Sequence, residues 1–153
     1  MNNKLIATGI LALMLCAVFV SVPADADGTG FDITDGEGRT YHYDSPAERI
    51  VSTGAATTLT IAEAGAVNKI VAVDRYSTYD YTGYDELEAM DAVDLGSFYG
   101  ETNHDYIVTT LINMVDNGEL SLDDTIILTS YTSNRALYER LHNTGFTKVL
   151  VWT

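Results

Sequence analysis

Two short segments near the start of the chain alternate apolar and polar residues. Residues 31–35 and 39–43 place Phe, Ile or Tyr at every second position, which is the period of a half-buried β-strand. The glycine-rich sequence Gly36-Glu37-Gly38 joins the two segments, and Ser45-Pro46 follows the second. The pattern predicts a small β-hairpin.

Beyond the hairpin, short apolar runs alternate with segments in which apolar residues have the spacing of an α-helix. The runs are too continuous for strands exposed on one side and favour a parallel sheet that is covered on both faces. The alternation predicts an α/β fold with an open, mostly parallel sheet and helices on both faces. The expected strands are 50–52, 69–73, 93–95, 125–129 and 148–152, and the expected helices are 56–64, 84–90, 105–115 and 134–143.

In an open parallel sheet, ligands bind beyond the carboxyl ends of the strands. Four loops follow strands in this way, at 52–58, 74–84, 96–103 and 130–134. These loops are therefore where candidate binding residues are sought.

The first 26 residues have the pattern of a secretory signal peptide. Lys4 precedes an almost unbroken apolar run, and Ala24-Asp25-Ala26 has the small residues of a cleavage site. An uncleaved membrane anchor is the alternative, because the run approaches the ~20 residues of a membrane span. Cleavage would remove the only cysteine, Cys16, and leave residues 27–153 as one domain. This domain is expected outside the cytoplasm or at the cell surface.

Composition and motifs exclude several functions. With 8 basic residues against 22 acidic residues and a net charge of −14, the chain lacks the basic surface that nucleic acids require. The histidines His42, His104 and His142 are far apart, so no zinc motif is formed. There is no nucleophile elbow and no thiol in the mature chain, which favours a binding protein over an enzyme.

The first of the four loops has the geometry of an anion site. Thr53 and Gly54 join a strand to a helix, so free backbone N–H groups should face the ligand edge, and Thr57 can add a hydroxyl group. Plain helix capping is the alternative.

Tyrosine is the most informative residue type. The chain has ten tyrosines, and five of them, with Phe98, fall in two of the ligand-edge loops: Tyr76, Tyr79, Tyr81, Tyr84 and Tyr99. The expected ligand contacts are Tyr76, Tyr79, Phe98 and Tyr99, together with Tyr131 in the fourth loop. Large flat rings with a polar tip suit a bulky, partly apolar ligand, and a phenolate can also ligate haem iron. Ordinary packing is the alternative for some of them.

A family resemblance rests on an ordered set of short motifs. These are Thr34-Asp35-x-x-Gly38-Arg39, then Arg49-Ile-Val-Ser52, then Gly65-Ala66 and Lys69-Ile-Val-Ala-Val73-Asp74-x-Tyr76, followed by Gly96-Ser97-Phe98. In this order the chain resembles the solute-binding proteins of ABC importers for iron-siderophores, haem and cobalamin. The resemblance covers nearly all of residues 31–152. Ala55-Ala56 replaces a Pro-Ser that is often found in the family, and Asn117-Gly118-Glu119 replaces a compact Lys-Pro-Asp.

The resemblance implies two α/β lobes joined by a long helix, of which this chain supplies the amino-terminal lobe and stops before the helix. The chain would then be a fragment, or a lobe that acts alone or with a separate partner chain. The ligand would be a ferric siderophore, haem or cobalamin, and Tyr76, Tyr79 and Phe98 match positions near it. Asp105 matches a glutamate that docks on the transporter permease; an acid in the first turn of a helix is the alternative.

The function expected from these observations is capture of a metal chelate outside the cytoplasm for an ABC importer. Association with the membrane would come from the permease or from an uncleaved signal. A cell-surface interaction module built on the same lobe is the alternative function.

Overall fold

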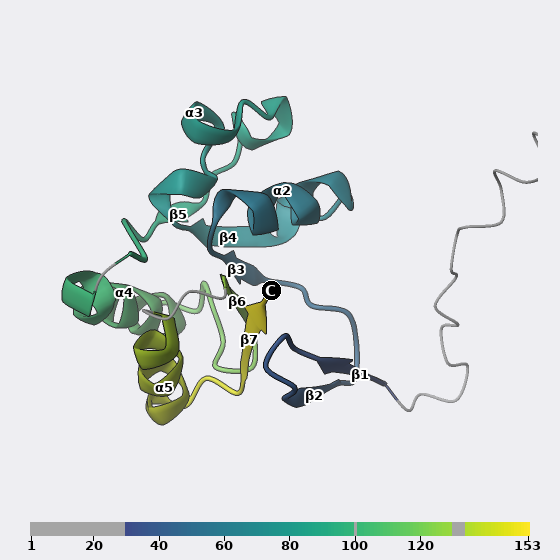
Figure 1. The fold of residues 1–153 in the computed structure, drawn as a ribbon, viewed down its shortest axis with the longest axis vertical. Helices are drawn as coiled ribbons and strands as arrows, with labels where there is room; N and C mark the ends of the chain where they lie inside the picture. Colours follow the sequence, from purple (N-terminus) through teal and green to yellow (C-terminus); the bar gives the residue numbers. More distant parts are fainter. Residues whose placement is uncertain (1–29, 100, 130–133) are drawn as a thin grey trace, which may run out of the picture. The chain divides into compact units, whose positions relative to one another are not determined.

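The computed structural model describes residues 30–99, 101–129 and 134–153, and all of these except Gly30 belong to the compact unit Phe31–Thr153. The expected signal peptide lies outside the described residues. Figure 1 shows a single sheet with helices on both of its faces and a separate hairpin. The strands are β1 (Phe31–Thr34), β2 (Thr40–Tyr43), β3 (Ile50–Ser52), β4 (Ile70–Val73), β5 (Val93–Asp94), β6 (Thr125–Thr129) and β7 (Lys148–Trp152). The α-helices are α2 (Ala55–Glu63), α3 (Tyr79–Thr82), α4 (His104–Asp116) and α5 (Asn134–Thr144).

All neighbouring strands of the main sheet are parallel, in the order β5-β4-β3-β6-β7. The chain runs from β3 outward to β5 and then returns to the other side of β3 for β6 and β7. The direction of winding therefore changes between β3 and β6, which is where ligands of doubly wound folds bind. The predicted α/β class and the predicted parallel sheet are confirmed.

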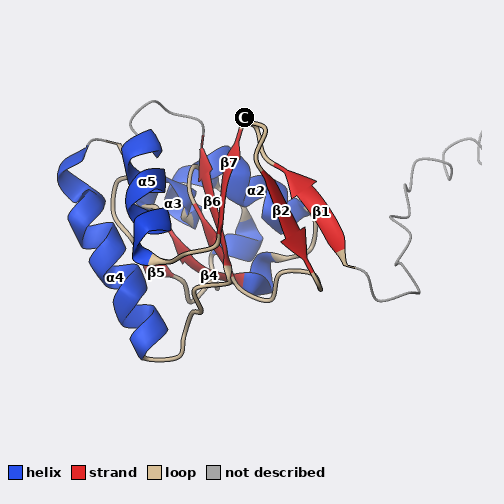
Figure 2. Ribbon diagram, turned by 90° about the horizontal axis from the view of Figure 1, so that it is seen from below, coloured by secondary structure: helices blue, strands red, loops and turns tan. Residues whose placement is uncertain are grey.

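The helices divide between the two faces of the sheet. Figures 1 and 2 place α4 and α5 on one face and α2 on the other. The core between the sheet and the α4–α5 pair contains Val51, Ile126, Leu128, Val149 and Val151 from the strands, at alternating positions along β6 and β7. From the helices it contains Ile107, Leu111, Met114, Leu137 and Leu141. Burial of these apolar side chains is what holds the layers together.

The hairpin is attached to β7 by three hydrogen bonds. The backbone N–H of Gly36 donates to the Val151 carbonyl (2.8 Å), the Val151 N–H donates to Asp35 Oδ2 (3.2 Å), and the Tyr41 hydroxyl donates to the Val149 carbonyl (2.6 Å). The side chain of Asp35 is fully buried and also forms an ion pair with Arg39 at 2.9 Å. Burial alone would raise the pKa of Asp35, but hydrogen bonds from Arg39, Val151 and Glu37 outweigh it and lower the pKa below its usual value.

The segment between β4 and β5 differs from the sequence prediction. Residues 74–84, expected as a loop, contain a 3-10 helix (Arg75–Ser77) and α3, which ends at Gly83 in the left-handed conformation. The helix expected over 84–90 is only a 3-10 turn, Asp85–Leu87. The backbone N–H groups of Leu87 and Glu88 donate to the carbonyls three residues back, those of Tyr84 (3.0 Å) and Asp85 (3.1 Å), which is the 3-10 pattern.

Candidate functional site

The carboxyl ends of β3 and β6 meet at the point where the winding direction changes, and Thr53 joins them. Its side chain is fully buried, and its Oγ1 accepts a hydrogen bond from the backbone N–H of Thr129 at 3.0 Å. Its own N–H donates to the Ile127 carbonyl at 3.1 Å. The hydroxyl of Thr53 is therefore occupied in holding the two loops together.

Gly54 follows with a φ of +82°, and its surroundings leave no room for a side chain. A β-carbon at this position would lie 2.2 Å from Thr129 Cγ2. Its backbone N–H donates to Asp74 Oδ1 at 3.1 Å, so it too is occupied by a protein acceptor. Both residues expected to contact a ligand through this loop thus have a structural role, and a binding role for them stays a prediction.

Asp74 connects the loops that follow β3 and β4. Its side chain is almost fully buried, and Oδ1 also accepts a hydrogen bond from Ser77 Oγ at 2.5 Å. Burial raises the pKa of Asp74 above its usual value, and the hydrogen bonds from Ser77 and Gly54 offset only part of that effect. Buried acids with raised pKa values gather at functional sites, and this acid lies at the carboxyl edge of the sheet.

Thr57 lies in the first turn of α2 and is 3% exposed. Its hydroxyl has no hydrogen-bond partner among the described residues, whereas the neighbouring Thr58 hydroxyl pairs with Ser52 Oγ at 2.9 Å. No side chain caps the amino terminus of α2. The expected ligand contact through Thr57 is left as a prediction.

Three tyrosines form an aromatic group at the same edge of the sheet, which we call the tyrosine cluster: Tyr76, Tyr81 and Tyr99. The ring of Tyr76 meets Tyr81 at 5.2 Å and Tyr99 at 5.3 Å between centroids, both edge to face. Tyr81 is 62% exposed and Tyr99 is 48% exposed. The Arg75 N–H donates to the Gly96 carbonyl at 3.0 Å and ties together the two loops that carry the rings.

The remaining aromatic candidates have different surroundings. Phe98 is 2% exposed and packs in the core with Leu95 and Ile107, so its ring does not line the exposed edge. Tyr79 is 37% exposed on α3, near the cluster in sequence. Tyr131 lies outside the described residues.

One member of the cluster, Tyr81, and one residue next to it, Arg75, were not among the expected ligand contacts. Tyr81 falls in a predicted ligand-edge loop, and its ring meets Tyr76 because this segment forms α3 where a loop was expected. Arg75, next to Tyr76, is exposed at the same edge. A signal for Arg75 was present in the sequence, since it is the only basic residue in the four ligand-edge loops.

Asp105 lies in the first turn of α4, with its side chain 89% exposed. It forms an ion pair with Arg140 of α5. The carboxylate is accessible from solvent, and its expected role in docking a permease stays a prediction.

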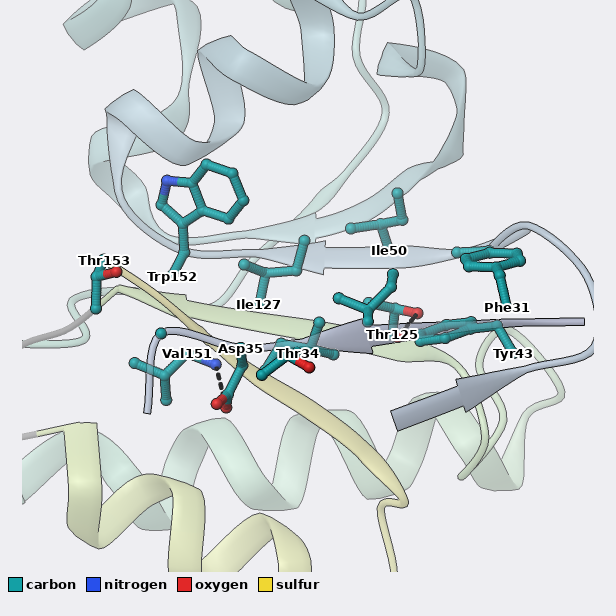
Figure 3. Close-up of a pocket in the computed structure, with 14 residues that line it drawn as sticks. Phe31, Thr34, Asp35, Tyr43, Ile50, Thr125, Ile127, Val151, Trp152 and Thr153 are labelled. Atoms are coloured by element: carbon teal, nitrogen blue, oxygen red, sulfur yellow. Dashed lines mark hydrogen bonds between the residues drawn. The ribbon is translucent and has the colours of Figure 1, made fainter. Parts of the chain in front are cut away.

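A separate apolar groove of about 460 Å³ lies between the hairpin and the sheet (Figure 3). Phe31 stacks on Tyr43 at one end of it, with centroids 5.4 Å apart, and Trp152 stands at the other end. Ile50, Ile127 and Leu150 also line it. None of its lining residues belongs to the tyrosine cluster.

Within 30–99, 101–129 and 134–153, no group of three or more His, Cys, Asp or Glu side chains is arranged to hold a metal ion. In the same part of the chain, no helix has the length and apolar character needed to cross a bilayer. No protein-family model matches the sequence, and no curated protein matches it.

Proposed function

We propose that this chain is a ligand-binding lobe of an extracytoplasmic solute-binding protein. It captures a metal chelate, either a ferric siderophore, haem or cobalamin, and presents it to the permease of an ABC importer. The observation that carries the proposal is the exposed tyrosine cluster at the carboxyl edge of a parallel sheet.

The position of the cluster favours ligand binding over packing. Exposing large aromatic surface to water is unfavourable, and exposed aromatic groups commonly mark binding sites. Tyr81 and Tyr99 each leave about half of their surface open beside Tyr76. Ring faces and edges set at such angles suit a bulky, partly apolar chelate that also carries oxygen atoms.

Hydrogen bonds hold the loops that carry the tyrosine cluster in place. Asp74 ties the loop after β3 to the loop after β4, and the Arg75–Gly96 hydrogen bond ties the loop after β4 to the loop after β5. A site fixed by such bonds needs little ordering when a ligand binds, which favours affinity. Asp105, exposed on α4, is the proposed contact with the permease.

The test is titration of the exported chain with haemin, a ferric hydroxamate siderophore, a ferric catecholate siderophore and cyanocobalamin, followed by tyrosine and tryptophan fluorescence. We expect Tyr76→Ala and Tyr99→Ala each to weaken binding of the preferred chelate about tenfold, because each removes an aromatic contact. The control is Tyr106→Ala, which removes an equally exposed tyrosine from α4. Circular dichroism verifies that each variant is folded.

Equal binding by the wild type and both cluster variants would overturn the assignment of the site. Failure of the wild type to bind any of the four chelates would overturn the capture function. In that case a cell-surface interaction module, with the exposed tyrosines as its contact surface, becomes the better description.

A further inference from the structure

One arginine differs from every other basic residue in the described part of the chain. Arg75 has no carboxylate within ion-pair distance there and lies over no aromatic ring, although acidic residues outnumber basic ones almost threefold in the whole sequence. The other basic residues have partners: Arg39, Arg49, Lys69, Arg135 and Arg140 form ion pairs, and Lys148 lies over the ring of Tyr43.

Two acids of the segments that adjoin Arg75 already accept other hydrogen bonds. Asp74 accepts hydrogen bonds from Gly54 and Ser77, and Asp94 accepts one from the backbone N–H of Gly96 at 2.7 Å. Their oxygens hold the loops in shape instead of neutralising the guanidinium group. The side chain of Arg75 is therefore left exposed with its five N–H donors available.

Gly96 keeps space open beside this guanidinium group. It has a φ of +73°, and a β-carbon there would lie 2.9 Å from Asn103 Nδ2 and 3.9 Å from Arg75 Nη2. The amide of Asn103 in turn donates to the carbonyls of Leu95 and Ser97. The loop after β5 is thus fixed in a form that lets the arginine lie close to its backbone.

Arg75 also adjoins the tyrosine cluster directly. It precedes Tyr76 in sequence. Its backbone N–H donates to Gly96, and this hydrogen bond joins the loops after β4 and β5, which also carry the rings of Tyr76 and Tyr99. A planar cation and a set of aromatic rings are therefore held together at one edge of the sheet.

We propose that Arg75 and the tyrosine cluster select ligands that are flat and carry a carboxylate group. A ring face of the cluster contacts the plane of the ligand, and the guanidinium group binds the carboxylate through paired hydrogen bonds. This inference rests on the proposed function and narrows it: a tetrapyrrole with free carboxylates, such as haem, is preferred over a corrinoid whose rim carries amides.

The net negative charge of the protein does not prevent a carboxylate ligand from binding at Arg75. At physiological salt, charges more than about 8 Å apart are largely screened, so the overall charge of −14 repels an anionic ligand only weakly at contact. The paired hydrogen bonds to Arg75 act at short range and are not screened in the same way. A carboxylate can therefore bind at Arg75 although the protein as a whole is acidic.

The experiment compares haemin with haemin dimethyl ester, which has the same ring and no free carboxylate. Dissociation constants are measured for the full exported chain, for Arg75→Gln and for Arg135→Gln. Arg135 is the matched control because it is an exposed arginine on α5, so both substitutions change the net charge equally. Circular dichroism shows whether each variant retains its fold.

We expect Arg75→Gln to weaken haemin binding about tenfold and to leave ester binding within about twofold of the wild type. Arg135→Gln should leave the affinity for both compounds unchanged. Arg75→Lys should recover part of the lost affinity, since an ammonium group keeps the charge but not the paired geometry.

Equal weakening of haemin binding by both glutamine variants would show a general charge effect and overturn the role of Arg75. Unchanged haemin binding in Arg75→Gln would also overturn it while leaving the proposed capture function intact. If the wild type binds cyanocobalamin more tightly than haemin, the carboxylate preference is wrong although capture is right. If it binds no chelate at all, capture and this inference fail together.

Discussion

The hairpin end of the molecule and the tyrosine edge use the same residue type in opposite ways. At the hairpin end, the hydroxyl of Tyr41 donates to Val149, the hydroxyl of Tyr43 pairs with Thr125 at 3.1 Å, and Arg39 lies 3.7 Å from the ring centroid of Tyr138. At the other end, the hydroxyls of Tyr76 and Tyr81 have no hydrogen-bond partner among the described residues. Tyrosines with bonded hydroxyls build the fold, whereas the unbonded hydroxyls of Tyr76 and Tyr81 remain available to a ligand.

The arginines at the two ends, Arg39 and Arg75, also differ in whether they have a protein partner. Arg39 is paired with the buried carboxylate of Asp35, while Arg75 stands beside acids that are bonded elsewhere. The pairing of Arg39 contributes to stability, whereas the exposed Arg75 contributes little to it. Substitutions at the hairpin end should therefore lower stability, and substitutions at the tyrosine edge should change binding.

The largest effect is expected from Asp35→Ala at the hairpin end. It removes the acceptor for the N–H of Val151 and leaves Arg39 without its buried partner. Loss of one member of such a pair should lower the free energy of unfolding by about 3–4 kcal/mol, measured by urea denaturation. Glu37→Gln is the control, because Glu37 contacts Arg39 from a half-exposed position and should change stability by less than about 1 kcal/mol. A small effect of Asp35→Ala would mean that the hairpin does not stabilise the sheet.

A smaller loss is expected from Gly54→Ala at the carboxyl edge. The new β-carbon would overlap Thr129 Cγ2 and would also occupy a strained backbone conformation, for a combined cost of about 2–3 kcal/mol. Gly65→Ala is a matched control because Gly65 has a φ of +79° and nothing within 4 Å of the β-carbon position. It should cost only about 1 kcal/mol, from backbone strain alone. Equal losses in thermal denaturation would show that the close approach to Thr129 has no energetic weight.

The smallest effect is a pH dependence of opposite sign at the two ends. Because the pKa of Asp35 is lowered below its usual value of 3.8 by its hydrogen bonds, its contribution is present above that pH and lost as the pH falls. Because burial raises the pKa of Asp74 above 3.8, the protonated form is favoured by folding, and stability falls as the pH rises through the raised pKa.

Urea midpoints measured from about pH 3 to pH 7 separate these two contributions. Asp74→Asn should remove the decline on the neutral side, since its amide oxygen can still accept from Gly54 and Ser77. Glu119→Gln, at an exposed turn after α4, is the control for loss of one acid. An unchanged profile in Asp74→Asn would contradict the raised pKa.

Most of the fold could be predicted from the spacing of apolar residues. The strands 50–52, 125–129 and 148–152 were predicted with the bounds observed, because each is a short apolar run that must be buried on both faces. The segment after β4 could not be predicted well. Its structure depends on 3-10 turns and on the left-handed Gly83, and these leave no periodic pattern.

The candidate site was predicted in outline and not in detail. The loops were correctly located at the carboxyl edge, because that follows from strand order alone. Which rings face solvent depends on tertiary packing, and for this reason the sequence did not separate the buried Phe98 from the exposed Tyr99. Thr53 and Gly54 have neighbours far away in sequence, so their structural bonds could not be foreseen.

The bonds between the hairpin and β7 also affect how the protein behaves in a crowded solution. A bare outer strand offers its N–H and carbonyl groups to another chain and can start fibril growth or strand exchange. Here the Val149 carbonyl and both backbone groups of Val151 are already taken by Tyr41, Asp35 and Gly36. The opposite outer strand, β5, is only two residues long. The parallel sheet is therefore closed to self-templated extension at one side and offers very little to it at the other.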